Sequence, residues 1–323
     1  MGHTQPPKDA PMIRSVLALL DIRPAYTAML AERHDLHRYD LVPDKQKFLD
    51  EMGDQIRAVV TSARFGVPED LLAQLPNLEV ITSFGVGHDV FDLKALRERG
   101  IRLSTTPDVL TDDVADTAIM LMHATLRQLV LGDDWVRSGK WAAKGPMALT
   151  RSVRGRKLGI VGLGRIGQAI ASRAVPSGVE VGYFGRSRKD VEYRFFDELT
   201  ALATWSDILV LSCPGGDATN GIVNEAVLEA LGKDGVVINI ARGSVMDEPA
   251  LIRALQHGLI AGAGLDVFEN EPDIDPAFAN LHNVVLYPHL ASGTVETRDA
   301  MGQLVVDNLD AWDERQELIT PLV

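Results

Sequence analysis

Apolar residues along the first hundred positions follow two alternating patterns. Short continuous apolar runs, rich in Val, Ile and Leu, predict buried strands, and between them apolar residues recur at helical spacing. The predicted strands cover residues 15–20, 56–61, 78–83 and 101–105, and helices are predicted at 24–33 and 89–99. Strands that alternate with helices in this way are typical of a parallel sheet covered by helices. We therefore expect one parallel sheet in the first hundred residues.

A second series of the same kind follows a long connecting helix. The helix is predicted from Thr111, a suitable N-cap with two acidic residues behind it, to about Arg137. After the turn-rich residues 138–155, strands are predicted at 158–161, 179–184, 208–212, 236–240, 260–265 and 284–286. Six strands are enough for a complete dinucleotide-binding sheet. Residues 292–317 have helical spacing but are too few for a domain, so we expect them to pack on the first half.

The composition is that of a folded protein with a hydrophobic core. Of the 323 residues, 46% are hydrophobic, a fraction too high for a disordered chain. The single cysteine, Cys213, excludes an intrachain disulfide and a zinc site built from cysteines. His88, His123 and His257 have no partner at the spacing of metal ligands, so we expect no metal site.

The charge balance argues against two classes of partner. The chain carries 32 Lys and Arg against 45 Asp and Glu, a net charge of −13, which opposes binding to phosphate backbones and anionic lipid. Residues 1–11 lack the apolar run of a signal peptide, and no later segment has the run of about 18 apolar residues that spans a membrane. We therefore expect a cytoplasmic protein without nucleic-acid or membrane partners.

A glycine-rich loop follows the predicted strand 158–161 and opens a helical pattern. The loop consists of Gly162, Leu163, Gly164, Arg165, Ile166 and Gly167. In the G-x-G-x-x-G motif the first glycine makes a tight turn, the second lets the backbone approach a pyrophosphate, and the third allows close packing of helix on strand. A glycine-rich turn with a structural role is the alternative, but the strand before and the helix after favour a dinucleotide site.

The residues after the next predicted strand indicate which dinucleotide is bound. An NAD site places an acidic residue there to bind the ribose 2′-hydroxyl. This chain has Arg186, Ser187 and Arg188 instead. Guanidinium and hydroxyl groups bind a 2′-phosphate, which a carboxylate would repel. The pattern predicts NADP, and the alternative is that both arginines are solvated loop charges.

Three chemically mixed segments follow predicted strands of the second series, where ligands of open α/β sheets bind. Residues 239–244 include Arg242, residues 265–272 include Glu271, and residues 287–289 end in His289. Taken singly, these residues are also compatible with a structural histidine and a surface ion pair. Together, an arginine, a glutamate and a histidine at neighbouring strand ends are candidates for one catalytic site.

The motifs identify a family. The chain resembles the D-isomer-specific 2-hydroxyacid dehydrogenases, in particular their glyoxylate/hydroxypyruvate reductase branch. The resemblance rests on the glycine loop at Gly162, NIARG at Asn239, GLDVFENEP at Gly264, PHLASGT at Pro288 and TDDVAD at Thr111, in the family's order. It implies an α/β fold of two Rossmann-like domains with parallel sheets. A dinucleotide-binding domain (109–291) is inserted into a flavodoxin-like substrate-binding domain (1–108 and 292–323).

The resemblance also implies roles for the strand-end residues. His289 would donate a proton to the keto oxygen, Glu271 would be its hydrogen-bonded partner, and Arg242 would clamp the substrate carboxylate and carbonyl. Elementary electrostatics agrees with these roles, because hydride addition builds negative charge on oxygen and positive groups there stabilise the transition state. A carboxylate beside the imidazole favours its charged form and fixes its tautomer.

Further contacts follow from the same resemblance. The substrate carboxylate would bind main-chain N–H groups at Gly85, Val86 and Gly87, together with Arg242 and His289, although residues 83–88 are also compatible with an ordinary turn. Asp266 would lie near the nicotinamide carboxamide, although a helix-capping aspartate would have the same sequence signature. The remaining predicted cofactor contacts are Ala241, Cys213 and Pro214.

The predicted function is the NADPH-dependent reduction of hydroxypyruvate or glyoxylate to the D-2-hydroxy acid. 2-Ketogluconate is the alternative substrate, and an aromatic 2-keto acid is a weaker one. A nucleotide-sensing corepressor is an alternative of another class, but the chain lacks the long disordered tails of such proteins. Formate dehydrogenases of the superfamily carry Gln in place of Glu271, and phosphoglycerate dehydrogenases usually add a regulatory domain. A homodimer is expected through residues 111–155, which carry Trp135, Trp141 and Met147.

Overall fold

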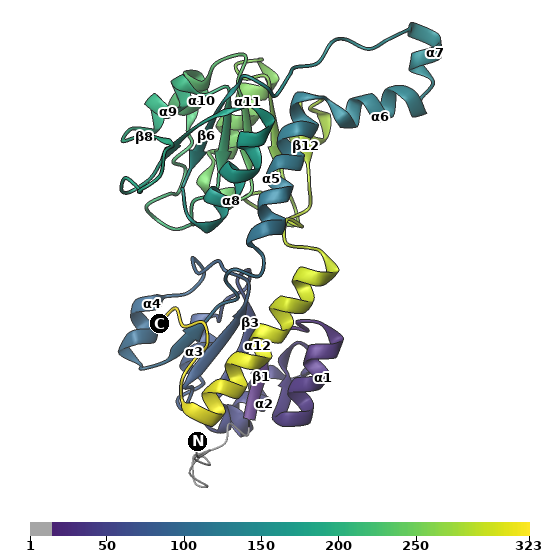
Figure 1. The fold of residues 1–323 in the computed structure, drawn as a ribbon. Coiled ribbons are helices and arrows are strands. Elements are labelled where there is room, and N and C mark those ends of the chain that lie inside the picture. Colours follow the sequence, from purple (N-terminus) through teal and green to yellow (C-terminus); the bar gives the residue numbers. More distant parts are fainter. Residues whose placement is uncertain (1–14) are drawn as a thin grey trace, which may run out of the picture. The chain divides into compact units, whose positions relative to one another are not determined.

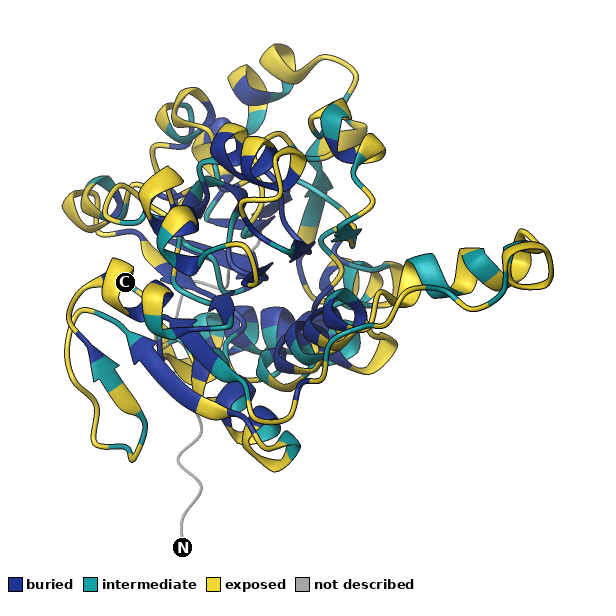
Figure 2. Ribbon diagram, turned by 90° about the horizontal axis from the view of Figure 1, so that it is seen from above, coloured by how far each residue is buried: buried dark blue, intermediate teal, exposed yellow. Residues whose placement is uncertain are grey.

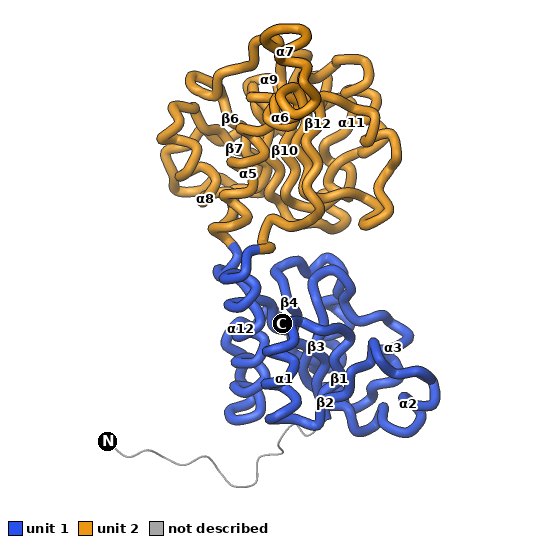
Figure 3. The backbone as a smooth tube through the Cα atoms, turned by 90° about the vertical axis from the view of Figure 1, so that its right-hand side faces the viewer, with its two compact units in different colours: residues 1–110, 294–323 blue, residues 111–293 orange. Residues whose placement is uncertain are grey.

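The computed structural model describes residues 15–323 and divides the chain into two compact units (Figure 3). One consists of Met1–Leu110 and Thr294–Val323, and the other of Thr111–Gly293. Each unit contains one sheet in which all strands are parallel (Figure 1). The predicted α/β class with two parallel sheets is therefore confirmed. The sequence argument about a signal peptide falls on residues 1–11, outside the described residues.

The first unit has a five-stranded sheet in the order β2-β1-β3-β4-β5. This is the flavodoxin-like order, in which ligands bind beyond the carboxyl ends of the strands. Its strands are β1 (Ser15–Ala18), β2 (Asp35–Arg38), β3 (Ala58–Ser62), β4 (Val80–Phe84) and β5 (Arg102–Ser104). Every residue of β1, β3 and β4 is buried, as the apolar runs predict. Strand β2 was not predicted, because Asp, His and Arg make up three of its four residues at the edge of the sheet.

Helices complete the first unit, including one from the C-terminal stretch of the chain. They are α1 (Pro24–Arg33), α2 (Lys45–Met52), α3 (Glu69–Ala73), α4 (Leu93–Glu98) and α12 (Val295–Arg315). The Thr294 side chain caps α12 by accepting a hydrogen bond from the Thr297 N–H (3.1 Å). Helix α12 packs on α1 and on the sheet, so the expected return of the chain to the first half is confirmed.

The second unit has a seven-stranded sheet in the order β12-β11-β10-β9-β6-β7-β8. The chain reverses direction across the sheet between the adjacent strands β6 and β9, which is the switch point where dinucleotides bind in this topology. Its strands are β6 (Lys157–Val161), β7 (Glu180–Phe184), β8 (Arg194–Phe196), β9 (Ile208–Leu211), β10 (Val236–Asn239), β11 (Gly262–Leu265) and β12 (Val284–Leu286). Edge strand β8 was not predicted, because its three residues are too few to establish a pattern.

Helices of the second unit bury a large apolar core against this sheet. They are α5 (Thr111–Leu126), α8 (Arg165–Ala174), α9 (Leu199–Trp205), α10 (Glu225–Leu231) and α11 (Glu248–Gln256). Helix α5 packs closely on α8 and on β11. The core side chains come mainly from α9, α10, α11 and the strands between them. Because this core is closely packed with apolar side chains, polar side chains of this sheet are found mainly at or beyond the ends of the strands.

The single long helix expected from Thr111 to Arg137 is a wrong prediction. Helix α5 ends at Leu126, Gln128 has a left-handed backbone (φ 49°), and a new helix, α6, runs from Leu129 to Arg137. The burial changes at this break, since half of α5 is buried whereas no residue of α6 is. A short helix, α7 (Lys140–Lys144), follows, and Figure 2 shows both as exposed or intermediate. We call residues 129–149 the arm.

Candidate active site

The glycine loop has the geometry of a dinucleotide site. Gly162 has φ 95°, and a Cβ atom there would lie 2.7 Å from the Cα atom of Cys213. A Cβ at Gly167 would lie 2.3 Å from the carbonyl oxygen of Gly162, whereas a Cβ at Gly164 would meet open space. Packing thus requires the first and third glycines, and the second leaves room above the N-terminus of α8. The N–H groups at that helix end attract a pyrophosphate, so the loop fits the predicted cofactor.

The end of strand β9 lies against this loop. The Ser212 hydroxyl donates a hydrogen bond to the Gly162 carbonyl oxygen (2.7 Å). Cys213 follows, half-buried, and burial raises the pKa of its thiol to about 11. The thiol therefore stays protonated near neutral pH, as expected for a packing residue rather than a nucleophile. Pro214 is exposed at the same edge.

The loop after β7 presents the predicted phosphate ligands to solvent. Arg186, Ser187 and Arg188 are all exposed. The loop is tied down by Tyr183, a fully buried residue of β7 whose hydroxyl accepts a hydrogen bond from the Lys189 N–H (2.6 Å). Sequence reasoning missed Tyr183, because an aromatic residue in a strand is usually core packing.

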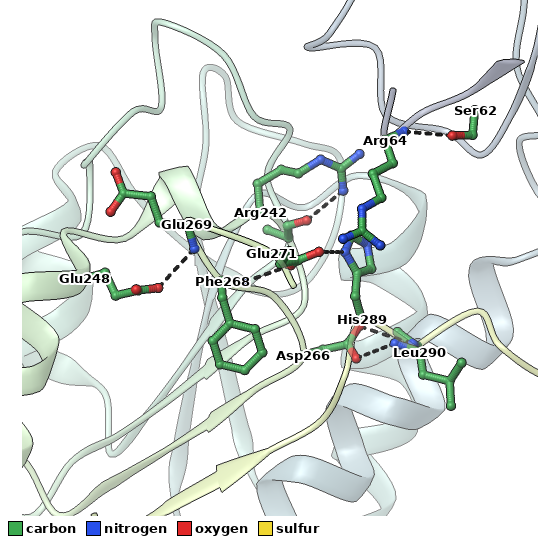
Figure 4. A network of polar contacts seen from close by, with 12 residues as sticks. Ser62, Arg64, Arg242, Glu248, Asp266, Phe268, Glu269, Glu271, His289 and Leu290 are labelled. Carbon is green, nitrogen blue, oxygen red and sulfur yellow. Dashed lines mark hydrogen bonds and ion pairs between the residues drawn. The ribbon is translucent and has the colours of Figure 1, made fainter. Parts of the chain in front are cut away.

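Glu271 and His289 form a hydrogen-bonded pair in the second unit (Figure 4). The Glu271 Oε2 atom lies 2.5 Å from Nδ1 of His289, and Oε1 accepts a hydrogen bond from the Phe268 N–H (2.9 Å). The Glu271 side chain is 14% exposed and that of His289 is 36% exposed. The pair is therefore shielded on the glutamate side and open on the histidine side. Because an ionised carboxylate only accepts, it favours the tautomer with a proton on Nδ1.

The backbone of His289 adopts an uncommon conformation that buried groups hold in place. Its φ is +51°, in the left-handed region that non-glycine residues rarely adopt. The His289 N–H donates to the Asp266 carbonyl oxygen (2.7 Å). The fully buried Asp266 carboxylate accepts hydrogen bonds from the N–H groups of Leu290 (2.8 Å) and Ala291 (3.1 Å). These hydrogen bonds fix the main chain at His289 and at the two residues that follow it.

Asp266 does not cap a helix, so that alternative reading of the sequence is wrong. It follows β11; the next helix along the chain is a 3-10 helix over Pro276–Asn280 that Asp275 caps, and α12 is capped by Thr294. Burial raises the pKa of the Asp266 carboxyl, and the two N–H donors oppose that rise. Its described contacts make it a support for the His289 segment, a role that the sequence does not reveal. The predicted nicotinamide contact stays a prediction.

Arg242 lies in an extended turn directly after β10. Buried Asn239 holds this turn, because its Oδ1 accepts from the Ala241 N–H and its Nδ2 donates to the Arg242 carbonyl oxygen, each at 3.0 Å. The Arg242 guanidinium donates to the Ala241 carbonyl oxygen (2.8 Å). Figure 4 shows the Arg242, Glu271 and His289 side chains close together; they belong to the segments that follow the adjacent strands β10, β11 and β12. The structure thus brings the three predicted residues together.

In the first unit, the predicted carboxylate-binding loop follows β4. Gly85 has φ 130°, and a Cβ there would lie 2.6 Å from that of Ala63, so the position requires glycine. The Gly85 N–H donates to Thr106 Oγ1 (3.0 Å). Within residues 15–323, no hydrogen bond engages the N–H groups of Val86 and Gly87. These two donors remain candidates for a substrate carboxylate.

None of the helices in residues 15–323 has the length and apolar character of a membrane span. The same part of the chain has no group of three or more His, Cys, Asp or Glu side chains arranged to hold a metal ion.

A glycine loop at the switch point of a parallel sheet, with an arginine and a Glu–His pair at neighbouring strand ends, defines a dinucleotide-dependent dehydrogenase. The family model of the D-isomer specific 2-hydroxyacid dehydrogenase NAD binding domain matches residues 119–291. The chain belongs to this family of oxidoreductases, and the resemblance stated from its motifs, including the glyoxylate/hydroxypyruvate reductase branch, is confirmed.

Similar proteins cover nearly the whole chain. A glyoxylate/hydroxypyruvate reductase of Arabidopsis thaliana is 48% identical over 91% of this chain and 94% of its own length. A 2-ketogluconate reductase of Gluconobacter oxydans is 46% identical over 95% of this chain and 98% of its own. An NADPH-dependent glyoxylate/hydroxypyruvate reductase of Sinorhizobium meliloti, solved with NADP and malonate, has a TM-score of 0.88 at 41% identity and covers 96% of this chain and 97% of its own.

Proposed function

We propose that the protein catalyses the NADPH-dependent reduction of a small 2-keto acid, hydroxypyruvate or glyoxylate, to the D-2-hydroxy acid. The observation that carries the proposal is the Glu271–His289 pair at 2.5 Å, with Arg242 at the neighbouring strand end. A histidine held by a carboxylate is a proton donor whose charged form is stabilised. The names of the relatives from Arabidopsis and Sinorhizobium support this substrate class.

In the proposed reaction each residue performs one task. Bound NADPH supplies the hydride to C2 of the keto acid. His289 donates a proton to the carbonyl oxygen from Nε2, the ring nitrogen that Glu271 does not engage. Glu271 stabilises the imidazolium before that transfer, and Arg242 binds the substrate carboxylate and the carbonyl oxygen as charge develops. In the loop after β4, the N–H groups of Val86 and Gly87 are the proposed carboxylate donors, because the Gly85 N–H already donates to Thr106 Oγ1.

The cofactor assignment has two supports. Arg186, Ser187 and Arg188 take the place of the acidic residue that binds a ribose 2′-hydroxyl, and the relative from Sinorhizobium was solved with NADP. The pyrophosphate binds the glycine loop, and Ala241, Cys213, Pro214 and Asp266 complete the proposed cofactor contacts. A cytoplasmic location also stays a prediction of the sequence.

Removing the substrate carboxylate is expected to lower kcat/KM at least tenfold. Without it, the Arg242 guanidinium and the loop N–H groups lose their partner, which costs at least about 1–3 kcal/mol. The test compares hydroxypyruvate with its amide at saturating NADPH. Equal kcat/KM for the two compounds would rule out the carboxylate clamp.

The same assay, extended to a panel, separates the candidate substrates. Glyoxylate and hydroxypyruvate are expected to exceed 2-ketogluconate and phenylpyruvate in kcat/KM. Because a relative that covers 95% of this chain is named a 2-ketogluconate reductase, that acid is the second candidate. A clear preference for it would keep the mechanism and change the substrate. No turnover of any 2-keto acid would overturn the proposed function and favour a nucleotide-binding role.

A homodimer formed through the arm is the proposed assembly, since the exposed apolar side chains of the arm would otherwise leave a large apolar area in water. The Trp135 indole donates to the Gly145 carbonyl oxygen (3.0 Å) and so joins the two parts of the arm. Its large exposed apolar side chains are Leu129, Val130, Val136, Trp141 and Leu149.

Sedimentation is expected to give a mass twice the 35.2 kDa of the chain. Replacing Val130, which is 60% exposed, by Asp should favour the monomer, because it places a charge in the proposed interface. Val175→Asp, at a 45% exposed valine outside the arm, is the matched control and should leave the mass unchanged. A concentration-independent monomer for the unmodified chain would refute the assembly.

A further inference from the structure

Glu248 is a buried acidic residue with no place in the proposed reaction. It is the first residue of α11 and is 6% exposed. Burial raises the pKa of its carboxyl, and the neighbouring Glu269, Asp275 and Glu271 raise it further, against a main-chain hydrogen bond that lowers it. Both effects disfavour a carboxylate at this position. Its presence therefore requires a compensating contact.

Helix stability alone does not explain the burial of Glu248. An acidic residue in a first helical turn is favourable when it is exposed to solvent. Helix α10 shows this, because it begins with the same arrangement at Asn224–Glu225, where the side chain of Glu225 is 60% exposed. In both helices the preceding residue is the side-chain cap, Asn224 for α10 and Asp247 for α11. The difference is that the Glu248 side chain turns inward.

The inward contact of Glu248 is with the turn that carries Glu271. Its Oε2 atom accepts a hydrogen bond from the Glu269 N–H (3.0 Å), as Figure 4 shows. The preceding N–H, that of Phe268, donates to Glu271 Oε1 (2.9 Å). Two successive main-chain N–H groups are thus bound by two glutamates, one on the helix and one in the site. The orientation of this short turn sets where the Glu271 carboxylate lies.

The turn that carries Arg242 contacts the same peptide group. A Cβ atom at Gly243 would lie 2.0 Å from the carbonyl carbon of Phe268 and 2.3 Å from the nitrogen of Glu269. The residue after Arg242 is therefore in direct contact with the Phe268–Glu269 peptide, which is held between Gly243 and Glu248. A small displacement of this peptide would move Glu271 relative to His289.

We propose that Glu248 is a positioning residue of the reductase: by accepting the Glu269 N–H it orients the 268–271 turn and so holds Glu271 at hydrogen-bond distance from His289. It acts through that turn, without touching substrate. The inference rests on the proposed reductase activity, which provides its readout.

The deciding variant is Glu248→Asp, which keeps the charge and the acidic first turn but withdraws the acceptor by one methylene. We expect kcat for keto-acid reduction to fall on the order of a hundredfold, the loss that a displacement of about 1 Å produces. The alkaline limb of the kcat profile should also move to lower pH, because Glu271 would stabilise the imidazolium less well. NADPH binding, measured by fluorescence, should be unchanged. Glu248→Gln keeps an acceptor oxygen at full length and should restore wild-type behaviour.

Glu225→Asp is the matched control, since it makes the same change at the start of α10 where the side chain is exposed. It should keep the wild-type kcat and pH profile. A wild-type kcat and profile for Glu248→Asp would overturn the inference, as would an equal loss in Glu248→Asp and Glu248→Gln. Absence of activity in the unmodified protein is a separate result, because it contradicts the proposed function itself.

Discussion

Replacing Glu271 by Gln is expected to move the alkaline limb of the keto-acid reduction profile to lower pH. In the proposed mechanism reduction requires protonated His289, and the Glu271 carboxylate lies 2.5 Å from Nδ1, where it would stabilise that form. A neutral amide does not, so the imidazolium loses its proton at lower pH. At a fixed pH on this limb, kcat of the variant should therefore be lower than that of the unmodified protein. The measurement is kcat against pH under conditions where chemistry limits the rate.

The direction in which the alkaline limb moves tests whether Glu271 is the charge partner of His289. Glu269→Gln is the control, because it removes the same charge from the same turn at an exposed side chain. Its limb should stay close to that of the unmodified protein. A limb that stayed in place or moved to higher pH in Glu271→Gln would show that Glu271 is not the charge partner of His289.

Replacing Arg186 by Ala is expected to lower the ratio of kcat/KM for NADPH to that for NADH by about tenfold to over a hundredfold. A paired guanidinium contact to a phosphate contributes roughly 1.5–3 kcal/mol, and NADH has no 2′-phosphate to lose. Residues 186–188, in the exposed loop after β7, include no carboxylate, which is the group that would favour NADH. Kinetics with both cofactors at a fixed keto-acid concentration give the ratio.

A surface arginine elsewhere controls for the general loss of positive charge. Arg137 on α6 is 77% exposed and pairs with Asp133, so Arg137→Ala should leave the cofactor ratio unchanged. If Arg186→Ala also left the ratio unchanged, the assignment of this loop to the phosphate would fail. The Glu271 result would be unaffected, because the two variants concern different steps.

The sequence by itself located the candidate chemistry, because strand ends can be found from local patterns. Strands β6, β10 and β12 consist mainly of apolar residues, so the glycine or polar residues that follow each run are conspicuous. The glycines at 162 and 167 were recognised by type and spacing, and the structure confirms that a Cβ would collide at both. Parallel strands end at one edge, which is why Arg242, Glu271 and His289 meet.

The hydrophobic pattern failed to predict elements whose burial differs from what their residues suggest. Strand β2 is polar because it lies at a sheet edge, and β8 is too short to show a period. The helical pattern of the sequence continues past Leu126, but the helix is interrupted at Gln128, because the residues that follow are no longer buried against the sheet. Propensity is local, whereas burial against a neighbour is not.

Only the tertiary structure decided which residues hold the site in place. Glu248 reaches the Glu269 N–H from a different element, 21 positions earlier, and Asp266 binds N–H groups 24 and 25 positions later. From sequence, both are acidic residues near a helix start or a strand end, where aspartate and glutamate are common for reasons unrelated to a site. Their roles depend on which main-chain N–H groups the fold brings within hydrogen-bond distance. Residue type and spacing therefore identified the proposed reacting groups of this protein, and long-range packing determined how those side chains are held.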